Sequence, residues 1–153
     1  TSEFEILAPV SGELVNLENT NDHAFSSRAV GDGVAVVPQE GTVCAPVSGT
    51  VAALFPTEHA LGIMSDDSSA QVMLHIGIDT VKLEGKGFHA LVAQGDHVDA
   101  GQPLVEVDFD VVRAAGFDPT VFVIVCERSE NSTLREHASG PVAVKEPVIW
   151  LSE

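Results

Sequence analysis

Cysteine is scarce in this chain of 153 residues, which contains only two, Cys44 and Cys126. They have no paired spacing, so the sequence excludes a disulfide framework and a zinc site built from thiolates. This cysteine usage indicates a reducing compartment. Both cysteines lie in apolar segments, and we therefore expect both to be buried.

Basic residues and long apolar runs are also scarce. Seven Lys and Arg residues face 23 Asp and Glu residues, which gives a formal net charge of −16. This charge disfavours nucleic acid and anionic membrane surfaces as partners, and it would attract a basic protein. Solubility or adaptation to high salt is the alternative explanation and accounts for most of the charge. No apolar run approaches the roughly 20 residues of a membrane span, and the first residues lack the basic stretch of a signal peptide. We therefore expect no direct membrane insertion and a cytoplasmic location.

Short apolar segments separated by glycine and proline dominate the rest of the chain. Hydrophobic residues make up 44% of it, which excludes a disordered chain and predicts one domain, residues 1–153, with a real core. The pattern predicts an all-β fold, a compact antiparallel β-sandwich or barrel with little helix. We expect loops at 17–25 and 80–88, a hairpin at 95–105 and one helix at 109–115, and the stretch 129–140 is polar.

The five-residue segment Ala-Pro-Val-Ser-Gly occurs twice, at residues 8–12 and again at residues 45–49. Each copy is followed by apolar residues typical of a strand. Two copies are too few for a solenoid. They predict instead two similar turn-and-strand units within one barrel or sandwich.

Two histidines are candidates for a chemical role. His75 ends the apolar run 72–74 and is followed by Gly77, while His59 lies in the segment Phe-Pro-Thr-Glu-His-Ala. A histidine that ends an apolar strand is more often structural, and the spacing alone does not show that the two rings meet. The alternative is that the two imidazoles face each other in a shallow apolar depression, where His75 carries a phosphoryl group transiently. Such transfer needs a neutral imidazole with one nitrogen held as N–H, for which the Gly77 carbonyl is the candidate acceptor. Thr57 supplies a hydroxyl beside the pair.

Other interpretations of these residues are weaker. His75 and Asp79 have the spacing of a zinc-endopeptidase pair, but the further His-x-His that such enzymes need is missing. Lipoyl and biotinyl carriers need a lysine at a hairpin tip, and none of the three lysines has that position. The remaining histidines, which have polar neighbours, are expected at the surface: His23, His89, His97 and His137.

Several segments resemble one protein family along nearly the whole chain. The run LHIGIDTVKLEGKGF at residues 74–88 and FPTEHA at 55–60 are similar to the glucose-family enzyme IIA domain of the phosphoenolpyruvate-dependent sugar phosphotransferase system. The segments VGDGVAVVP at 30–38 and GDHVDAGQPLVEVDFD at 95–110 extend the resemblance. It fades after about residue 124 and returns in the final strand.

This resemblance implies a phosphohistidine carrier. His75 matches the histidine that accepts a phosphoryl group on Nε2 from the carrier protein HPr and passes it to a cysteine on the IIB domain of a sugar permease. His59 matches the assisting histidine, and Thr57 matches the adjacent hydroxyl. Asp79 and Asp22 match an acidic rim suited to a basic patch on HPr.

The docking surface and the ligands are less well defined by the sequence. Four apolar residues are candidates to line the depression: Phe25, Leu61, Met73 and Val81. We expect no resident metal or cofactor. The resemblance allows a zinc ion at His59 and His75 whose further ligand comes from a partner. It also implies a second, regulatory role, in which target proteins bind according to the state of phosphorylation.

Overall fold

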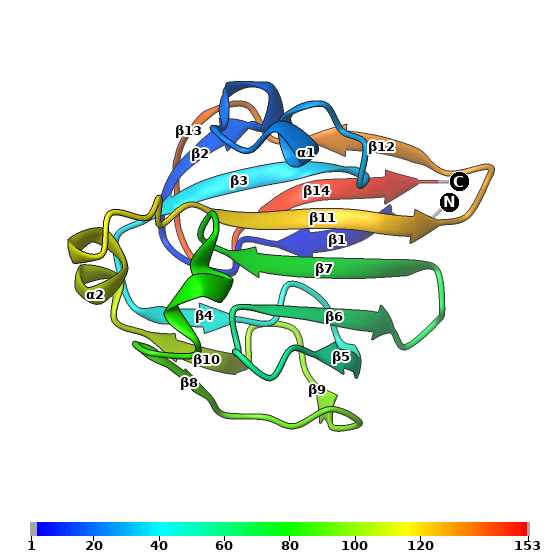
Figure 1. Ribbon diagram of the computed structural model, residues 1–153. Coiled ribbons are helices and arrows are strands. Elements are labelled where there is room, and N and C mark those ends of the chain that lie inside the picture. The colour runs from blue at the N-terminus through cyan, green and yellow to red at the C-terminus, as the bar shows by residue number, and fades with distance from the viewer. Residues whose placement is uncertain (1–2, 153) are drawn as a thin grey trace.

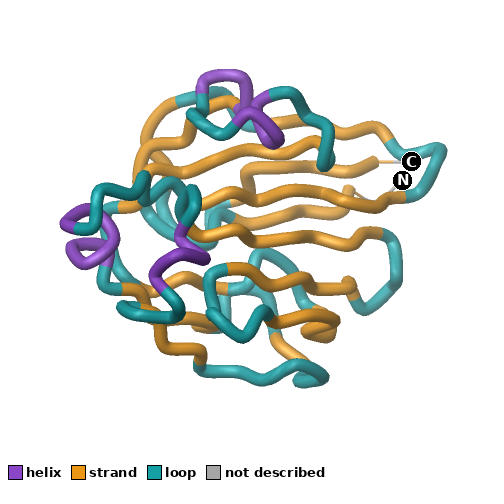
Figure 2. Tube along the Cα trace, viewed as in Figure 1, coloured by secondary structure: helices purple, strands orange, loops and turns teal. Residues whose placement is uncertain are grey.

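The computed structural model describes residues 3–152, of which most lie in strands or the turns between them (Figure 1). Fourteen strands are present in this part of the chain. They are β1 Glu3–Leu7, β2 Gly12–Asn16, β3 Asp32–Pro38, β4 Thr42–Cys44, β5 Gly49–Leu54, β6 Ala60–Ser65, β7 Ala70–Ile76, β8 Phe88–Ala90, β9 His97–Val98, β10 Pro103–Val107, β11 Val121–Arg128, β12 Thr133–Glu136, β13 Gly140–Val142 and β14 Pro147–Ser152. The helical segments are short and peripheral (Figure 2): η1 Leu17–Asn19, α1 His23–Ser26, η2 Thr80–Leu83 and α2 Phe109–Ala114.

The strands form three antiparallel sheets. The largest has eight strands in the order β13-β2-β3-β11-β7-β6-β5-β9, and two smaller sheets have the orders β1-β14-β12 and β4-β10-β8. The predicted all-β class is therefore confirmed. Among the described residues the sheets do not close into a barrel.

The strand order of the large sheet reads as an approximate two-fold repeat. Read from its two ends, β13 corresponds to β9, β2 to β5, β3 to β6 and β11 to β7. The two small sheets correspond in the same way, β1-β14-β12 to β4-β10-β8. The centre of this arrangement is the pair β7 and β11, which lie side by side with Leu74 opposite Val123 (Figure 1).

The two repeated segments lie at equivalent places in the two halves, and the residue before each one bonds to the proline of the other. The amide of Leu7 donates to the carbonyl of Pro46 at 2.8 Å, and the amide of Cys44 donates to that of Pro9 at 2.7 Å. Both serine hydroxyls of the repeat accept from a backbone amide at 2.8 Å. The prediction of two similar turn-and-strand units is thus confirmed.

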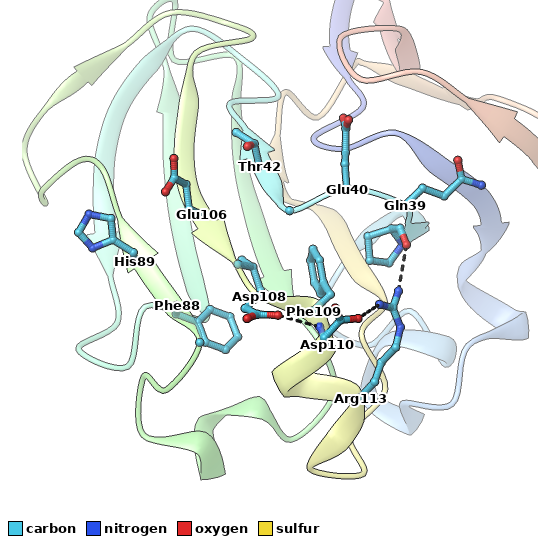
Figure 3. A pocket seen from close by; sticks show the side chains of 14 residues that line it. Gln39, Glu40, Thr42, Phe88, His89, Glu106, Asp108, Phe109, Asp110 and Arg113 are labelled. Atoms are coloured by element: carbon cyan, nitrogen blue, oxygen red, sulfur yellow. Dashed lines mark hydrogen bonds and ion pairs between the residues drawn. The ribbon is translucent and has the colours of Figure 1, made fainter.

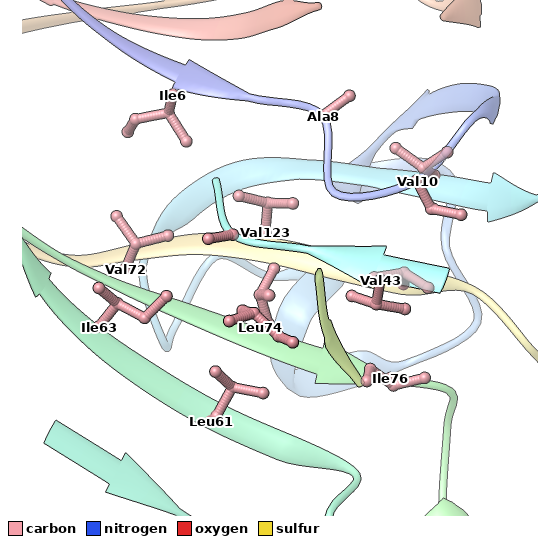
Figure 4. Packing of buried hydrophobic residues seen from close by; sticks show 14 of the residues in the cluster. Ile6, Ala8, Val10, Val43, Leu61, Ile63, Val72, Leu74, Ile76 and Val123 are labelled. Carbon is pink, nitrogen blue, oxygen red and sulfur yellow. The ribbon is translucent and has the colours of Figure 1, made fainter. Parts of the chain in front are cut away.

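Alternation along β7 decides which side chains reach the core. Val72, Leu74 and Ile76 are fully buried, whereas Met73 and His75 on the opposite face are half-buried. Figure 4 shows the inward-pointing residues packed between the sheets. His75 is therefore presented on the outer face of the large sheet.

Several expectations from the sequence were wrong. The stretch 95–105 is not a hairpin, because β9 pairs with β5 while β10 pairs with β4 and β8. The expected loops at 17–25 and 80–88 contain η1, α1 and η2, so α2 is not the only helical segment. The polar stretch 129–140, to which the sequence assigned no element, contains β12, which pairs with β14. Cys126 is half-buried, although Cys44 is buried as expected.

Close backbone approach at the repeated glycine gives a test of the fold. A Cβ atom on Gly49 would lie 2.1 Å from the carbonyl oxygen of Met64, a distance that requires the strands to separate. We expect Gly49→Ala to lower the free energy of unfolding by about 2 kcal/mol or more, measured by urea denaturation. Gly62→Ala is the matched control on the neighbouring strand.

The atom nearest to a Cβ on Gly62 would be the side-chain nitrogen Nε2 of Gln71, at 3.8 Å. That variant should change stability by less than about 1 kcal/mol, because it mainly restricts the unfolded chain. Equal stability of the two variants would contradict the close packing of β5 against β6.

Candidate functional site

His75 is held by the turn that follows β7. Its Nδ1 lies 2.8 Å from the carbonyl oxygen of Gly77, and a carbonyl can only accept, so Nδ1 carries the proton. In the neutral ring the lone pair is then on Nε2. Gly77 has a φ of +81°, and a Cβ there would lie 2.3 Å from Cγ2 of Thr80, so glycine is required at this turn. The contact expected from the sequence is confirmed.

His59 reaches the same place from the turn before β6. Ala60 is paired with His75, and the carbonyl of His59 accepts from the amide of Ile76 at 2.7 Å. The ring centroids of His59 and His75 are 5.1 Å apart, with the planes at 83°. Oγ1 of Thr57 lies 2.5 Å from Nδ1 of His59. The predicted convergence of the two imidazoles is therefore confirmed.

Burial keeps both imidazoles neutral near pH 7. Burial, with a smaller contribution from the charge of the nearby His75, lowers the pKa of His59 to about 4. Burial also lowers the pKa of His75, although the Gly77 carbonyl and the carboxylates of Asp22 and Asp79 oppose this effect. A neutral His75 has the free lone pair that a nucleophile needs.

Aromatic rings surround the pair. The ring centroids of Phe25 and His75 are 5.2 Å apart, and Phe25 stacks on Phe122 at 4.4 Å. Phe55 meets His59 edge-on at 5.4 Å and is 47% exposed. Sequence reasoning identified Phe25 but missed Phe122 and Phe55. The motif around His59 contains Phe55 and could have indicated it, whereas only the pairing of β11 with β7 brings Phe122 beside His75.

The other residues expected at the site divide into two groups. Met73 shares the outer face of β7 with His75, and Val81 is exposed in η2, just after the turn that holds His75. Asp79 is exposed. Leu61 is a correction: it is 1% exposed, lies opposite Leu74 and packs in the core (Figure 4). Its strand alternates, so a residue next to Ala60 must face inward.

The family model for the phosphoenolpyruvate-dependent sugar phosphotransferase system, EIIA 1, matches residues 4–131. The chain belongs to this family. Because the match covers most of the chain, the resemblance seen in the sequence motifs is confirmed.

Two relatives of this EIIA domain are much longer proteins. The chain is 42% identical over 147 residues to the beta-glucoside-specific EIIBCA component of Bacillus subtilis (strain 168), covering 96% of the chain and 24% of the relative. It is 41% identical to the N-acetylglucosamine-specific EIICBA component of Klebsiella pneumoniae, covering 95% of the chain and 22% of the relative. The chain thus spans about a quarter of these relatives.

A solved structure has the same fold. Glucose permease IIA from Mycoplasma capricolum superposes with a TM-score of 0.89 at 34% sequence identity, covering 98% of this chain and 96% of the other. Within residues 3–152 of the EIIA domain, no helix has the length and apolar character needed to cross a membrane.

A cavity elsewhere in the EIIA domain does not include the histidines. It has a volume of about 740 Å³ and lies where the end of β3 and the start of β4 meet β8, β10 and α2 (Figure 3). Its acidic side chains include Glu40, Glu106, Asp108 and Asp110. None of the residues expected at the phosphoryl site lines it.

The low pKa of His59 gives a prediction about stability. Because this pKa is about 4 in the folded chain against 6.5 normally, the unfolded chain binds more protons between these values. We expect the free energy of unfolding to fall as the pH drops from 7 to 4, with His59 contributing up to about 3 kcal/mol of the loss.

His59→Gln should remove this contribution and give a shallower dependence on pH, measured by urea denaturation at a series of pH values. The comparison with the unmodified chain cancels the carboxylates, which titrate in both. Parallel curves for the two chains would show that His59 is not held neutral by burial.

Proposed function

We propose that this EIIA domain, residues 1–153, accepts a phosphoryl group from HPr on Nε2 of His75 and passes it to a cysteine on the IIB domain of a sugar permease. The observation that carries the proposal is the bond between Nδ1–H of His75 and the carbonyl of Gly77. This bond selects the tautomer whose Nε2 can attack phosphorus. Membership of the EIIA family supports the same chemistry.

The transfer needs no net movement of a proton at His75. The Nε2 lone pair attacks phosphorus as the bond between phosphorus and the donor's nitrogen breaks. Nδ1 keeps its proton, and the ring gains positive charge as the new bond forms. The carbonyl oxygen of Gly77 stabilises that charge through the hydrogen bond it already accepts. Transfer to a cysteine thiolate reverses the process.

His59 is suited to bind the phosphoryl oxygens. When the hydroxyl of Thr57 donates to Nδ1 of His59, the neutral ring carries its proton on Nε2 and can donate it to a phosphoryl oxygen. The apolar surroundings strengthen this bond, since few water molecules compete for it. Thr57 therefore orients the assisting imidazole.

The exposed residues around the histidines suit protein partners. Phe55 and Val81 are 47% and 50% exposed and offer apolar contact area, while Asp22 and Asp79 offer negative charge near His75. A chain of net charge −16 attracts a basic partner over long range. These features support docking of HPr and IIB from the cytoplasm.

A zinc ion shared with a partner is a further proposal for the same pair. Nδ1 of each imidazole is engaged, by Gly77 and by Thr57, so Nε2 of each ring would be the zinc ligand. Among residues 3–152 no group of three or more His, Cys, Asp or Glu side chains could hold a metal ion. The partner would therefore have to complete the site, and the ion would join the two proteins.

Phosphorylation of His75 can be tested directly. Incubation with phosphoenolpyruvate, enzyme I and HPr should add one acid-labile phosphoryl group to the unmodified chain and none to His75→Ala, measured by intact mass or radiolabel. His59→Ala, which keeps His75, is the matched control and should be labelled. Label on His75→Ala would overturn the assignment.

The role of His59 can be separated from that of His75. We expect His59→Gln to accept the phosphoryl group but to pass it to the IIB cysteine about a hundredfold more slowly, because a transition-state donor is misplaced. Rapid-quench measurement of the two half-reactions distinguishes them. An unchanged rate of onward transfer would contradict the proposed donor.

A further inference from the structure

The segment between β2 and β3 presents Phe25 to His75, yet little within it explains its stability. Its helix α1 has only four residues, and helices this short do not persist on their own. The carboxylate of Asp22 accepts from the amide of Phe25 at 3.2 Å, and Leu17 packs in the same small cluster as Phe25 and Phe122. Stronger bonds to the rest of the protein come from Arg28, two residues after the end of the helix.

Arg28 joins both ends of this segment to a distant strand. Its guanidinium bonds to Glu18 in η1, to Asp32 at the start of β3 at 2.9 Å, and to Glu136 in β12 through two bonds of 2.7 and 3.1 Å. Figure 1 shows the connection around α1 next to β12. The side chains of Arg28 and Glu136 are 28% and 19% exposed, so the two hydrogen bonds between them are partly shielded from water.

The backbone at Arg28 also ends the helix. Its φ is +61°, a left-handed conformation that side chains rarely adopt, and its amide donates to the carbonyl of Phe25 at 3.0 Å. This conformation costs about 1 kcal/mol, which the side-chain bonds offset. The hydrogen bonds to Glu136, Glu18 and Asp32 raise the pKa of Arg28, so the cation is always present.

Loss of this cation would leave three carboxylates close together in an already acidic chain. Within the described part of the chain, Arg128 lies 3.8 Å from Asp32 and forms no ion pair with Glu18 or Glu136. Like charges would then repel, and the segment would move away from β12. Phe25 would be displaced with it, because only two residues separate Phe25 from Arg28.

We propose that Arg28 is a positioning residue for phosphoryl transfer, which holds α1 so that Phe25 covers one side of the His75 ring. This inference rests on the proposed function of His75. With Phe25 in place, the imidazole has little freedom to turn away from the Gly77 carbonyl. Small errors in the direction of the attacking nitrogen are costly, and a misplacement of about 1 Å can slow a reaction about a hundredfold.

The test compares Arg28→Met with two other variants. Phe25→Ala removes the cover itself, and Arg128→Met removes a cation that lies near Asp32 but forms no ion pair with Glu18 or Glu136. We expect Arg28→Met and Phe25→Ala each to slow phosphoryl transfer from phosphorylated HPr about tenfold. Arg128→Met should transfer at the unmodified rate.

The double variant Phe25→Ala with Arg28→Met decides whether Arg28 acts through Phe25. If it does, the double variant should be about as slow as Phe25→Ala alone rather than about a hundredfold slower. Additive effects, or a normal rate for Arg28→Met, would overturn the proposal. If Arg28→Met does not fold, Glu136→Gln weakens the same tether from β12 and should give the same pattern.

Nuclear magnetic resonance of the His75 ring separates this proposal from the proposed function. In Arg28→Met the ring should lose the fixed Nδ1–H tautomer and titrate at higher pH, whereas in Arg128→Met it should not change. This comparison needs no phosphoryl donor, so it decides the role of Arg28 even if His75 fails to accept a phosphoryl group. A ring unchanged in Arg28→Met would refute the positioning role.

Discussion

The pairing of β7 with its two neighbours is the constraint on which the histidine site depends. It places His75 opposite Ala60 on β6 and opposite Phe122 on β11. Because side chains alternate along a strand, a slip of one residue would turn His75 into the core and bring Leu74 to the surface. The buried face of β7 prevents this slip, so the packing of the core also fixes the position of the His75 ring.

The approximate two-fold repeat explains how two loops of different sequence both reach the ring of His75. The connections β2–β3 and β5–β6 are equivalent in the strand order, and both lead to the outer face of the central pair. One carries Phe25 to His75 and the other carries His59. The scaffold is nearly symmetric, but the loops differ, and the difference makes one site rather than two.

Electrostatics at the site oppose the charge of the whole chain. A net charge of −16 favours protonation of any histidine, yet burial lowers the pKa of both His59 and His75. Burial at the site therefore affects the two pKa values more than the net charge of the chain does. This balance leaves His75 neutral near pH 7, with the carboxylates of Asp22 and Asp79 nearby.

The sequence alone indicated the all-β class through the spacing of its short apolar segments, and the glycine that binds His75 through turn chemistry. The two histidines were identified by the resemblance of their motifs to a family, since their spacing alone is a weak signal. The sequence did not determine which strands pair. That is why residues 95–105 were mistaken for a hairpin, Leu61 for a surface residue, and Phe122 was overlooked. Pairing between distant strands depends on how whole faces pack, and only the tertiary structure decides it. The same holds for the bonds of Arg28 to Glu136: they join residues 108 positions apart, and only the tertiary structure brings these residues together.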